Sequence, residues 1–156
     1  MALILIADDD EIVVEVVVAA LGARGHVVAA LDDGLPVMHT VELTRPALVI
    51  LDCTMPELSG VEALRQIRTS QDFFDLPVLM LTERRSAEDE DIAMRMGATD
   101  YLRKPFDPDQ LVSWVEILLT RADERRLAAL TPSMPRLPMP SDRAEGLRSD
   151  RPWGRR

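Results

Sequence analysis

Acidic, hydroxyl and amino side chains follow four short apolar runs of this chain of 156 residues, at the points where the runs end. They are Asp8, Asp9 and Asp10 after LILIA, Asp52 after ALVIL, Thr82 after PVLML, and Lys104, the chain's single lysine, after TDYL. Ligands of open α/β sheets bind beyond the carboxyl ends of the strands. If these runs are parallel strands, the six side chains are candidates for one site.

The chemistry of such a site follows from its charges. Two carboxylates about 4 Å apart repel by roughly 4 kcal/mol at an effective dielectric constant near 20. Clustered acids therefore take up protons, stay solvated or bind a cation, and oxygen ligands favour Mg²⁺ over Zn²⁺. A hydroxyl and an ammonium group are suitable donors to a phosphoryl group. Asp52 stands alone at the end of its run and is the candidate nucleophile for an aspartyl phosphate.

Each residue also has a simpler interpretation. An acidic run before a helix complements the helix dipole, Asp52 could begin a turn, and a lysine before proline is often a surface residue. Asp32 and Asp33 also follow an apolar run, but an edge strand would hold them away from the centre of the sheet. The position of all three kinds of group at the ends of four runs, rather than any one residue, favours a site.

The apolar runs that would position these residues occupy 3–7, 27–30, 47–51, 77–81 and 99–102. Four of the five are nearly continuous rather than alternating, which is typical of strands buried on both faces of a parallel sheet. Residues 12–21 are rich in β-branched side chains, yet their length and their place between two runs favour a helix. The alternation predicts a (βα)5 chain, in which an open parallel sheet is covered by helices on both sides.

Helix boundaries carry their own signals. Ser59 with Glu62 three residues later has the pattern of a capping box. Asp107 before Pro108 is typical of an N-cap and first helical residue, and Gly97 suits the position just past a helix end. We expect the last helix to begin near Pro108 and to run to about residue 130.

Composition and charge limit the classes of function. The net charge of −9 divides into −13 for residues 1–119 and +4 for residues 120–156. An acidic globular part repels nucleic acid, so we expect no direct DNA binding. No apolar run is long enough for a membrane span, the first residues lack the basic segment of a signal peptide, and Cys53 is the single cysteine. We expect a cytoplasmic protein that does not bind membranes.

One domain is predicted over residues 1–121, followed by a helical extension and a disordered tail rich in proline and arginine over residues 122–156. The last 26 residues contain 5 of the chain's 11 prolines and show no periodic apolar pattern. That composition is typical of segments that form no packed core.

The motifs ILIADD, LVILDCTMPELSG, VLMLTE and YLRKPF, spread over about residues 1–120, resemble the receiver domain of two-component response regulators. The resemblance implies a flavodoxin-like, doubly wound sheet of five strands in the order 2-1-3-4-5. It also implies a phosphoacceptor at Asp52, which receives its phosphoryl group from a sensor histidine kinase or a histidine phosphotransfer protein. Mg²⁺ would be held by Asp8, Asp9, Asp52 and the backbone carbonyl of Thr54.

The same resemblance assigns the remaining motif residues. Thr82 and Lys104 would contact the phosphoryl group, and Tyr101 would move inward together with Thr82 as the switch. Pro105 would fix the backbone that aims Lys104, often through a cis peptide bond. Phosphorylation would then remodel the face formed by the fourth helix, fifth strand and fifth helix. Glu83 departs from the family pattern, where a small residue follows the threonine, and we expect it to slow phosphorylation.

The resulting expectation is a single-domain response regulator that switches protein partners and has no enzymatic activity beyond its own phosphorylation and dephosphorylation. One alternative is a pseudo-receiver that binds partners without phosphorylation. Another is a phosphatase of the haloacid dehalogenase type, which also uses an aspartyl nucleophile and Mg²⁺. That family requires a second aspartate two residues after the first, where this chain has Thr54.

Overall fold

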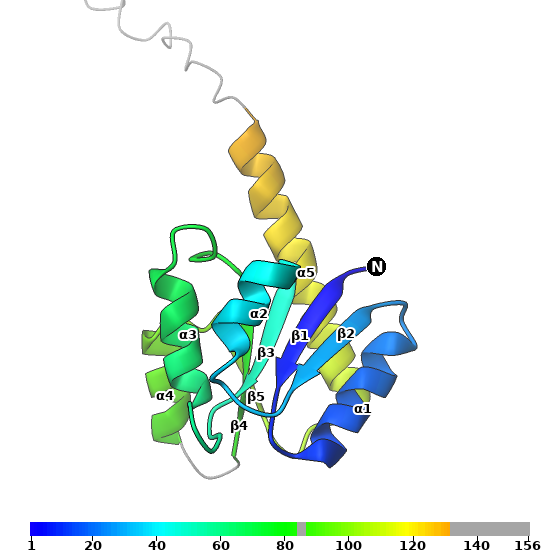
Figure 1. Ribbon diagram of the computed structural model, residues 1–156. Helices are drawn as coiled ribbons and strands as arrows, with labels where there is room; N and C mark the ends of the chain where they lie inside the picture. Colours follow the sequence, from blue (N-terminus) through cyan, green and yellow to red (C-terminus); the bar gives the residue numbers. More distant parts are fainter. Residues whose placement is uncertain (84–86, 132–156) are drawn as a thin grey trace, which may run out of the picture.

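The computed structural model describes residues 1–83 and 87–131, and within them five parallel strands alternate with five helices (Figure 1). The strands are β1 (Leu3–Ala7), β2 (Val27–Leu31), β3 (Leu48–Asp52), β4 (Val78–Thr82) and β5 (Asp100–Arg103). The helices are α1 (Glu11–Gly22), α2 (Val37–Thr44), α3 (Gly60–Thr69), α4 (Ala87–Arg95) and α5 (Pro108–Leu130). The strand order is β2-β1-β3-β4-β5, which confirms the predicted fold class and topology.

The strands follow the predicted runs closely, but four of them end one residue later than predicted. Asp52 pairs with Leu81 across β3 and β4, and Thr82 pairs with Arg103 across β4 and β5. The sheet ladder therefore includes Asp52 and Thr82 as the last strand residues, and rigid backbone holds both side chains.

The helices form two layers on the sheet, and strand alternation decides which layer each side chain meets. Along β1, Leu5 and Ala7 pack with α2, α3 and α4, whereas Ile4 and Ile6 pack with α1 and α5. Both layers are visible in Figure 1. All five residues of β3 and of β4 are buried, as expected for the central strands of a sheet covered on both faces.

Side-chain caps start three of the helices. Ser59 Oγ accepts the Glu62 N–H at 3.2 Å at the start of α3, and Asp107 accepts the Asp109 N–H at 2.8 Å at the start of α5. Both confirm the predicted helix starts. Gly97 has a φ of +103° just past α4, in the left-handed region that its predicted place requires.

Residues 12–21 are helical, as predicted, despite their β-branched side chains. Asp10 caps this helix, since its carboxylate accepts the Ile12 N–H at 3.0 Å. Val17 and Leu21, four residues apart, are fully buried against the sheet. Burial of one helical face outweighs the modest cost of β-branched residues in a helix.

Helix α5 continues well past the sheet (Figure 1). Residues 123–130 are all exposed, including Leu127 and Leu130. The predicted boundary after residue 121 stays a prediction because the helix crosses it without a break. The predicted disordered tail, from residue 132 onward, lies outside the described residues. No helix among the described residues is long and apolar enough to cross a membrane.

Candidate functional site

Asp52 is the buried centre of the site. It is the last residue of β3 and is 5% exposed. Its Oδ1 lies 3.5 Å from Lys104 Nζ and 3.4 Å from the Thr54 backbone nitrogen, whose N–H donates to it. Burial, followed by the nearby Asp8 carboxylate, raises the pKa of Asp52 to about 7, and Lys104 opposes this rise. Because burial is the largest cause, the raised pKa indicates that Lys104 does not fully offset the loss of solvent around Asp52 and the charge of Asp8.

The three consecutive aspartates after β1 have three different environments. Asp8 is 1% exposed, and its Oδ1 accepts the Asp10 N–H at 2.9 Å. Asp9 is exposed, and Asp10 is the cap of α1. Carboxylate oxygens of Asp8, Asp9 and Asp52 all lie within 4.8 Å of one another. Asp10 is therefore a helix cap, whereas Asp8 and Asp9 lie beside Asp52, and their role in a site stays a prediction.

Lys104 joins the two buried carboxylates. Its Nζ lies 2.8 Å from Asp8 Oδ2 and 3.5 Å from Asp52 Oδ1, and its side chain is 12% exposed. Burial lowers the pKa of Lys104, but its interactions with Asp8 and Asp52 outweigh burial, so the pKa is raised. The Lys104 N–H donates to the Thr82 carbonyl at 2.7 Å, and the Lys104–Pro105 peptide bond is cis, as predicted.

Thr82 ends β4, the strand next to β3, and is fully buried. Its hydroxyl has no hydrogen-bond partner among the described residues. A buried hydroxyl without a partner is costly, so this atom is available to a bound group. Glu83, the next residue, is exposed.

Tyr101 lies on β5 and is tied to α4 rather than to Asp52. A hydrogen bond to Glu90 raises the pKa of Tyr101. Glu90 is buried and also accepts hydrogen bonds from the Arg103 guanidinium, one of them at 3.0 Å from Nη2. Sequence reasoning did not single out Glu90, because a glutamate in the acidic helix AEDEDIAMR resembles a solvated charge.

Asp33 is a second residue that sequence reasoning set aside. Its strand, β2, is the edge strand, as assumed. Its carboxylate nevertheless reaches the loop after β3, where it accepts the N–H groups of Glu57 and Leu58. The available signal was the Asp-Gly pair at a strand end, which marks a tight turn.

The site residues fit a hard divalent cation. Asp8, Asp9 and Asp52 offer oxygen atoms within 4.8 Å of one another, and among the described residues Lys104 is the one cation that pairs with the two buried carboxylates. Burial and the Asp8 carboxylate together raise the pKa of Asp52, and a bound cation would offset both effects. Oxygen donors with excess negative charge are the donor set that Mg²⁺ prefers.

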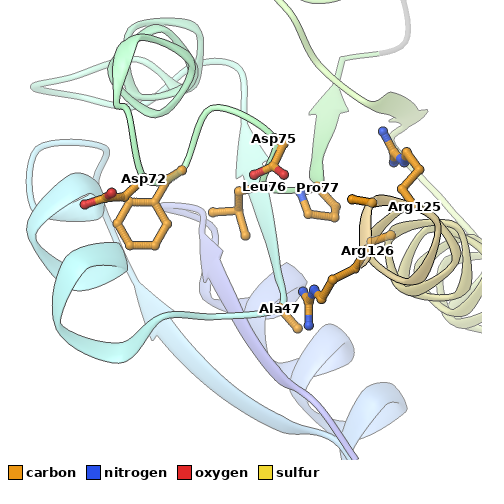
Figure 2. A pocket seen from close by; sticks show the side chains of 10 residues that line it. Ala47, Asp72, Asp75, Leu76, Pro77, Arg125 and Arg126 are labelled. Carbon is orange, nitrogen blue, oxygen red and sulfur yellow. The ribbon is translucent and has the colours of Figure 1, made fainter. Parts of the chain in front are cut away.

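A cavity of about 320 Å³ lies elsewhere, at the amino ends of β3 and β4 (Figure 2). Asp72, Phe73, Asp75, Leu76 and Pro77 line one side, Ala47 lies below, and Ala122, Arg125, Arg126 and Ala129 of α5 form the other wall. This cavity is at the opposite end of the strands from Asp52. The cavity lies between the last turns of α5 and the loops before β3 and β4.

Comparisons with known proteins agree with this geometry. A family model described as response regulator receiver domain matches residues 4–116. The response regulator MprA of Mycobacterium sp. (strain KMS) is 39% identical over 118 residues, which cover 76% of this chain and 50% of MprA. The chain thus spans about half the length of the curated relatives it matches.

Solved structures show the same likeness. The chemotaxis protein CheY4 of Vibrio cholerae has a TM-score of 0.71 and 30% identity, with coverage of 76% of this chain and 98% of CheY4. NtrX from Brucella abortus has a TM-score of 0.76 and 28% identity, over 83% of this chain and 29% of NtrX.

Proposed function

Because this chain belongs to the response regulator receiver domain family, we propose that it accepts a phosphoryl group on Asp52 from a phosphohistidine of a sensor histidine kinase or histidine phosphotransfer protein. One observation carries the proposal: the buried Asp52 carboxylate lies beside Asp8 and within reach of the Lys104 ammonium group. Clustered carboxylates repel one another, and a bound cation would offset this repulsion and leave the Lys104 ammonium group free to contact a phosphoryl group.

In the proposed reaction a carboxylate oxygen of Asp52 attacks phosphorus. An O–P bond forms while the N–P bond of the phosphohistidine breaks, and the imidazole leaves with the electron pair of that bond and takes a proton from solvent. Asp52 must be ionised to attack, and Lys104 favours that form. After transfer, Lys104 and the unpaired Thr82 hydroxyl are the donors for the phosphoryl oxygens.

Asp8, Asp9 and Asp52, with the Thr54 carbonyl, are the proposed holders of Mg²⁺. When bound, the ion neutralises negative charge on the phosphoryl oxygens and orients them. The protein's own part is to keep three oxygen donors close together while burying two of them.

The proposed output is a change of protein partner through the face of α4, β5 and α5. Glu90 on α4 holds Tyr101 and Arg103 of β5, so movement of Tyr101 would break a contact on that face. We propose that the protein catalyses only its own phosphorylation and dephosphorylation and acts on no other substrate. The expectation of a single-domain regulator stays a prediction, since the curated relatives are about twice as long as the matched region.

Incubation with Mg²⁺ and acetyl phosphate tests the proposal by intact-protein mass. We expect one added phosphoryl group, no addition in Asp52→Asn or in the presence of EDTA, and no turnover of an unrelated phosphomonoester. The absence of any addition to the wild-type chain would instead support a pseudo-receiver. Steady turnover of the phosphomonoester would support the phosphatase alternative.

A further inference from the structure

Asp33 joins two loops that are far apart in the sequence. It lies just after β2, and its Oδ1 accepts the Leu35 N–H at 2.8 Å within its own turn. The same carboxylate accepts two N–H groups of the loop after β3, from Glu57 at 2.9 Å and from Leu58 at 3.1 Å. These backbone donors lower the pKa of Asp33, the one from Glu57 most strongly. A single carboxylate therefore holds Glu57 and Leu58, in the second half of the loop that follows Asp52.

Gly34 brings the two loops into direct backbone contact beside this carboxylate. It is buried, and a Cβ at this position would overlap the Leu58 carbonyl oxygen. A residue other than glycine would push the loops apart. The Asp33 hydrogen bond and the close backbone contact of Gly34 thus both act on Leu58.

The clamped loop, residues 53–59, contains Thr54. At its other end Gly60 packs on the Asp52 carbonyl with no room for a Cβ, and the Gly60 N–H donates to the Cys53 carbonyl at 3.1 Å. Thr54 itself is exposed, and its N–H reaches Asp52 at the long distance of 3.4 Å. A hydrogen bond of that length is weak, so the loop's anchors, rather than this bond, fix the position of Thr54.

We propose that Asp33 is a positioning residue for the cation site: by clamping Glu57 and Leu58 it fixes where the Thr54 carbonyl stands relative to Asp52. The inference rests on the proposed function for its consequence, which is tighter Mg²⁺ binding and faster phosphorylation at limiting Mg²⁺. Asp33 is not one of the proposed ligands of the ion or of the phosphoryl group. Residues that orient metal ligands in this indirect way affect metal affinity by about 10–100-fold.

The test compares Asp33→Asn with Asp32→Asn. The amide oxygen of the first variant could still accept the Leu35 and Leu58 N–H groups, as Oδ1 does, but its NH₂ group cannot accept the Glu57 N–H that Oδ2 binds, so the Glu57 bond and the charge are lost. The exposed Asp32 is the adjacent residue, so its substitution removes the same charge from nearly the same place. Two quantities are measured: the dissociation constant for Mg²⁺ by calorimetry, and NMR order parameters of the Thr54 and Ile50 amides without metal.

We expect Asp33→Asn to weaken Mg²⁺ binding about tenfold or more, with Asp32→Asn within about twofold of wild type. The Thr54 order parameter should fall from about 0.85 towards 0.6 in Asp33→Asn alone, while that of Ile50, inside β3, stays unchanged. Saturating Mg²⁺ should restore most of the phosphorylation rate, because the affinity is what is lost. An unchanged Thr54 order parameter overturns the proposal, and so does an equal fall at Ile50, which would indicate general loosening.

Failure of the proposed function gives a different result. If the wild-type chain binds no Mg²⁺, the proposed cation site is rejected. The positioning role of Asp33 is then tested by the Thr54 order parameter alone. A selective fall of its order parameter then supports the positioning role, and no fall overturns it. Phosphorylation by acetyl phosphate with a wild-type Thr54 order parameter in Asp33→Asn would leave the function intact and reject the clamp.

Discussion

Replacing Asp52 by asparagine should stabilise the metal-free protein above neutral pH. The folded Asp52 carboxyl keeps its proton up to about pH 7, whereas a free aspartate ionises near 3.8. Between these values the folded state binds more protons, so the free energy of unfolding falls as pH rises from about 4 to about 7. Asparagine cannot ionise, and it leaves the Lys104–Asp8 pair at 2.8 Å in place.

The pKa sets the size of this effect. A rise from 3.8 to about 7 corresponds to at most about 4 kcal/mol. The site opens to solvent at Asp9, and charges near solvent interact more weakly than that limit, so we expect about 1–2 kcal/mol. Asp52→Asn should exceed wild type by this amount at pH 8 and match it near pH 4.

Urea unfolding in EDTA at pH 4.5, 6 and 8, followed by circular dichroism, measures the difference. Asp72→Asn is the control, since Asp72 is an exposed carboxylate beside the distant cavity. Saturating Mg²⁺ should reverse the order, because a ligand that binds only the folded state stabilises it and asparagine is a poorer ligand. Stability curves of wild type and Asp52→Asn that stay parallel from pH 4.5 to 8 would refute the reasoning.

Three further changes test other parts of the site. Lys104→Arg keeps the charge but replaces a compact ammonium with a planar fork, and we expect at least a tenfold slower rate with acetyl phosphate; a wild-type rate would contradict the size argument. Glu83→Ala should speed phosphorylation in the same assay by removing an exposed carboxylate next to Thr82, and an unchanged rate would reject a role for Glu83. A chain ending at Arg121 should keep the fold with a melting temperature within a few degrees of the full chain, because residues 123–130 are exposed; cooperative unfolding lost altogether would show that the extension is part of the domain.

The sequence predicted the strand ends to within one residue, because hydrophobicity and side-chain chemistry change close to these positions. Asp8 directly follows an apolar strand and Asp52 ends one, and a nearly continuous apolar run that stops at a carboxylate indicates where a strand buried on both faces ends. Helix starts at Ser59 and Asp107 were predictable for a related reason, since a cap is a local contact between residues two or three apart.

What the sequence did not reveal depends on contacts across long separations. Glu90 and Arg103 come from different elements, and only the packing of α4 on β5 shows that the glutamate is buried. Asp33 was set aside because an edge strand lies far from β3 in the sheet. The loops that follow β2 and β3 nevertheless meet beyond the end of the sheet. Asp33 there accepts a hydrogen bond from Leu58, which is 25 residues away in the sequence.

This difference has a consequence for the cation site. Asp52 belongs to the ladder between β3 and β4, and Asp8 directly follows β1, with its N–H donating to the Leu31 carbonyl of β2 at 3.0 Å. Thr54 belongs to a loop, and by our proposal its position depends on anchors in the loop after β2 and at the start of α3. Substitutions at the anchors should therefore change Mg²⁺ affinity while leaving the Asp52–Lys104 geometry intact, whereas substitutions in the strands should affect both. Variation in receiver sensitivity to Mg²⁺ would then be sought in the loop anchors before the acidic residues themselves.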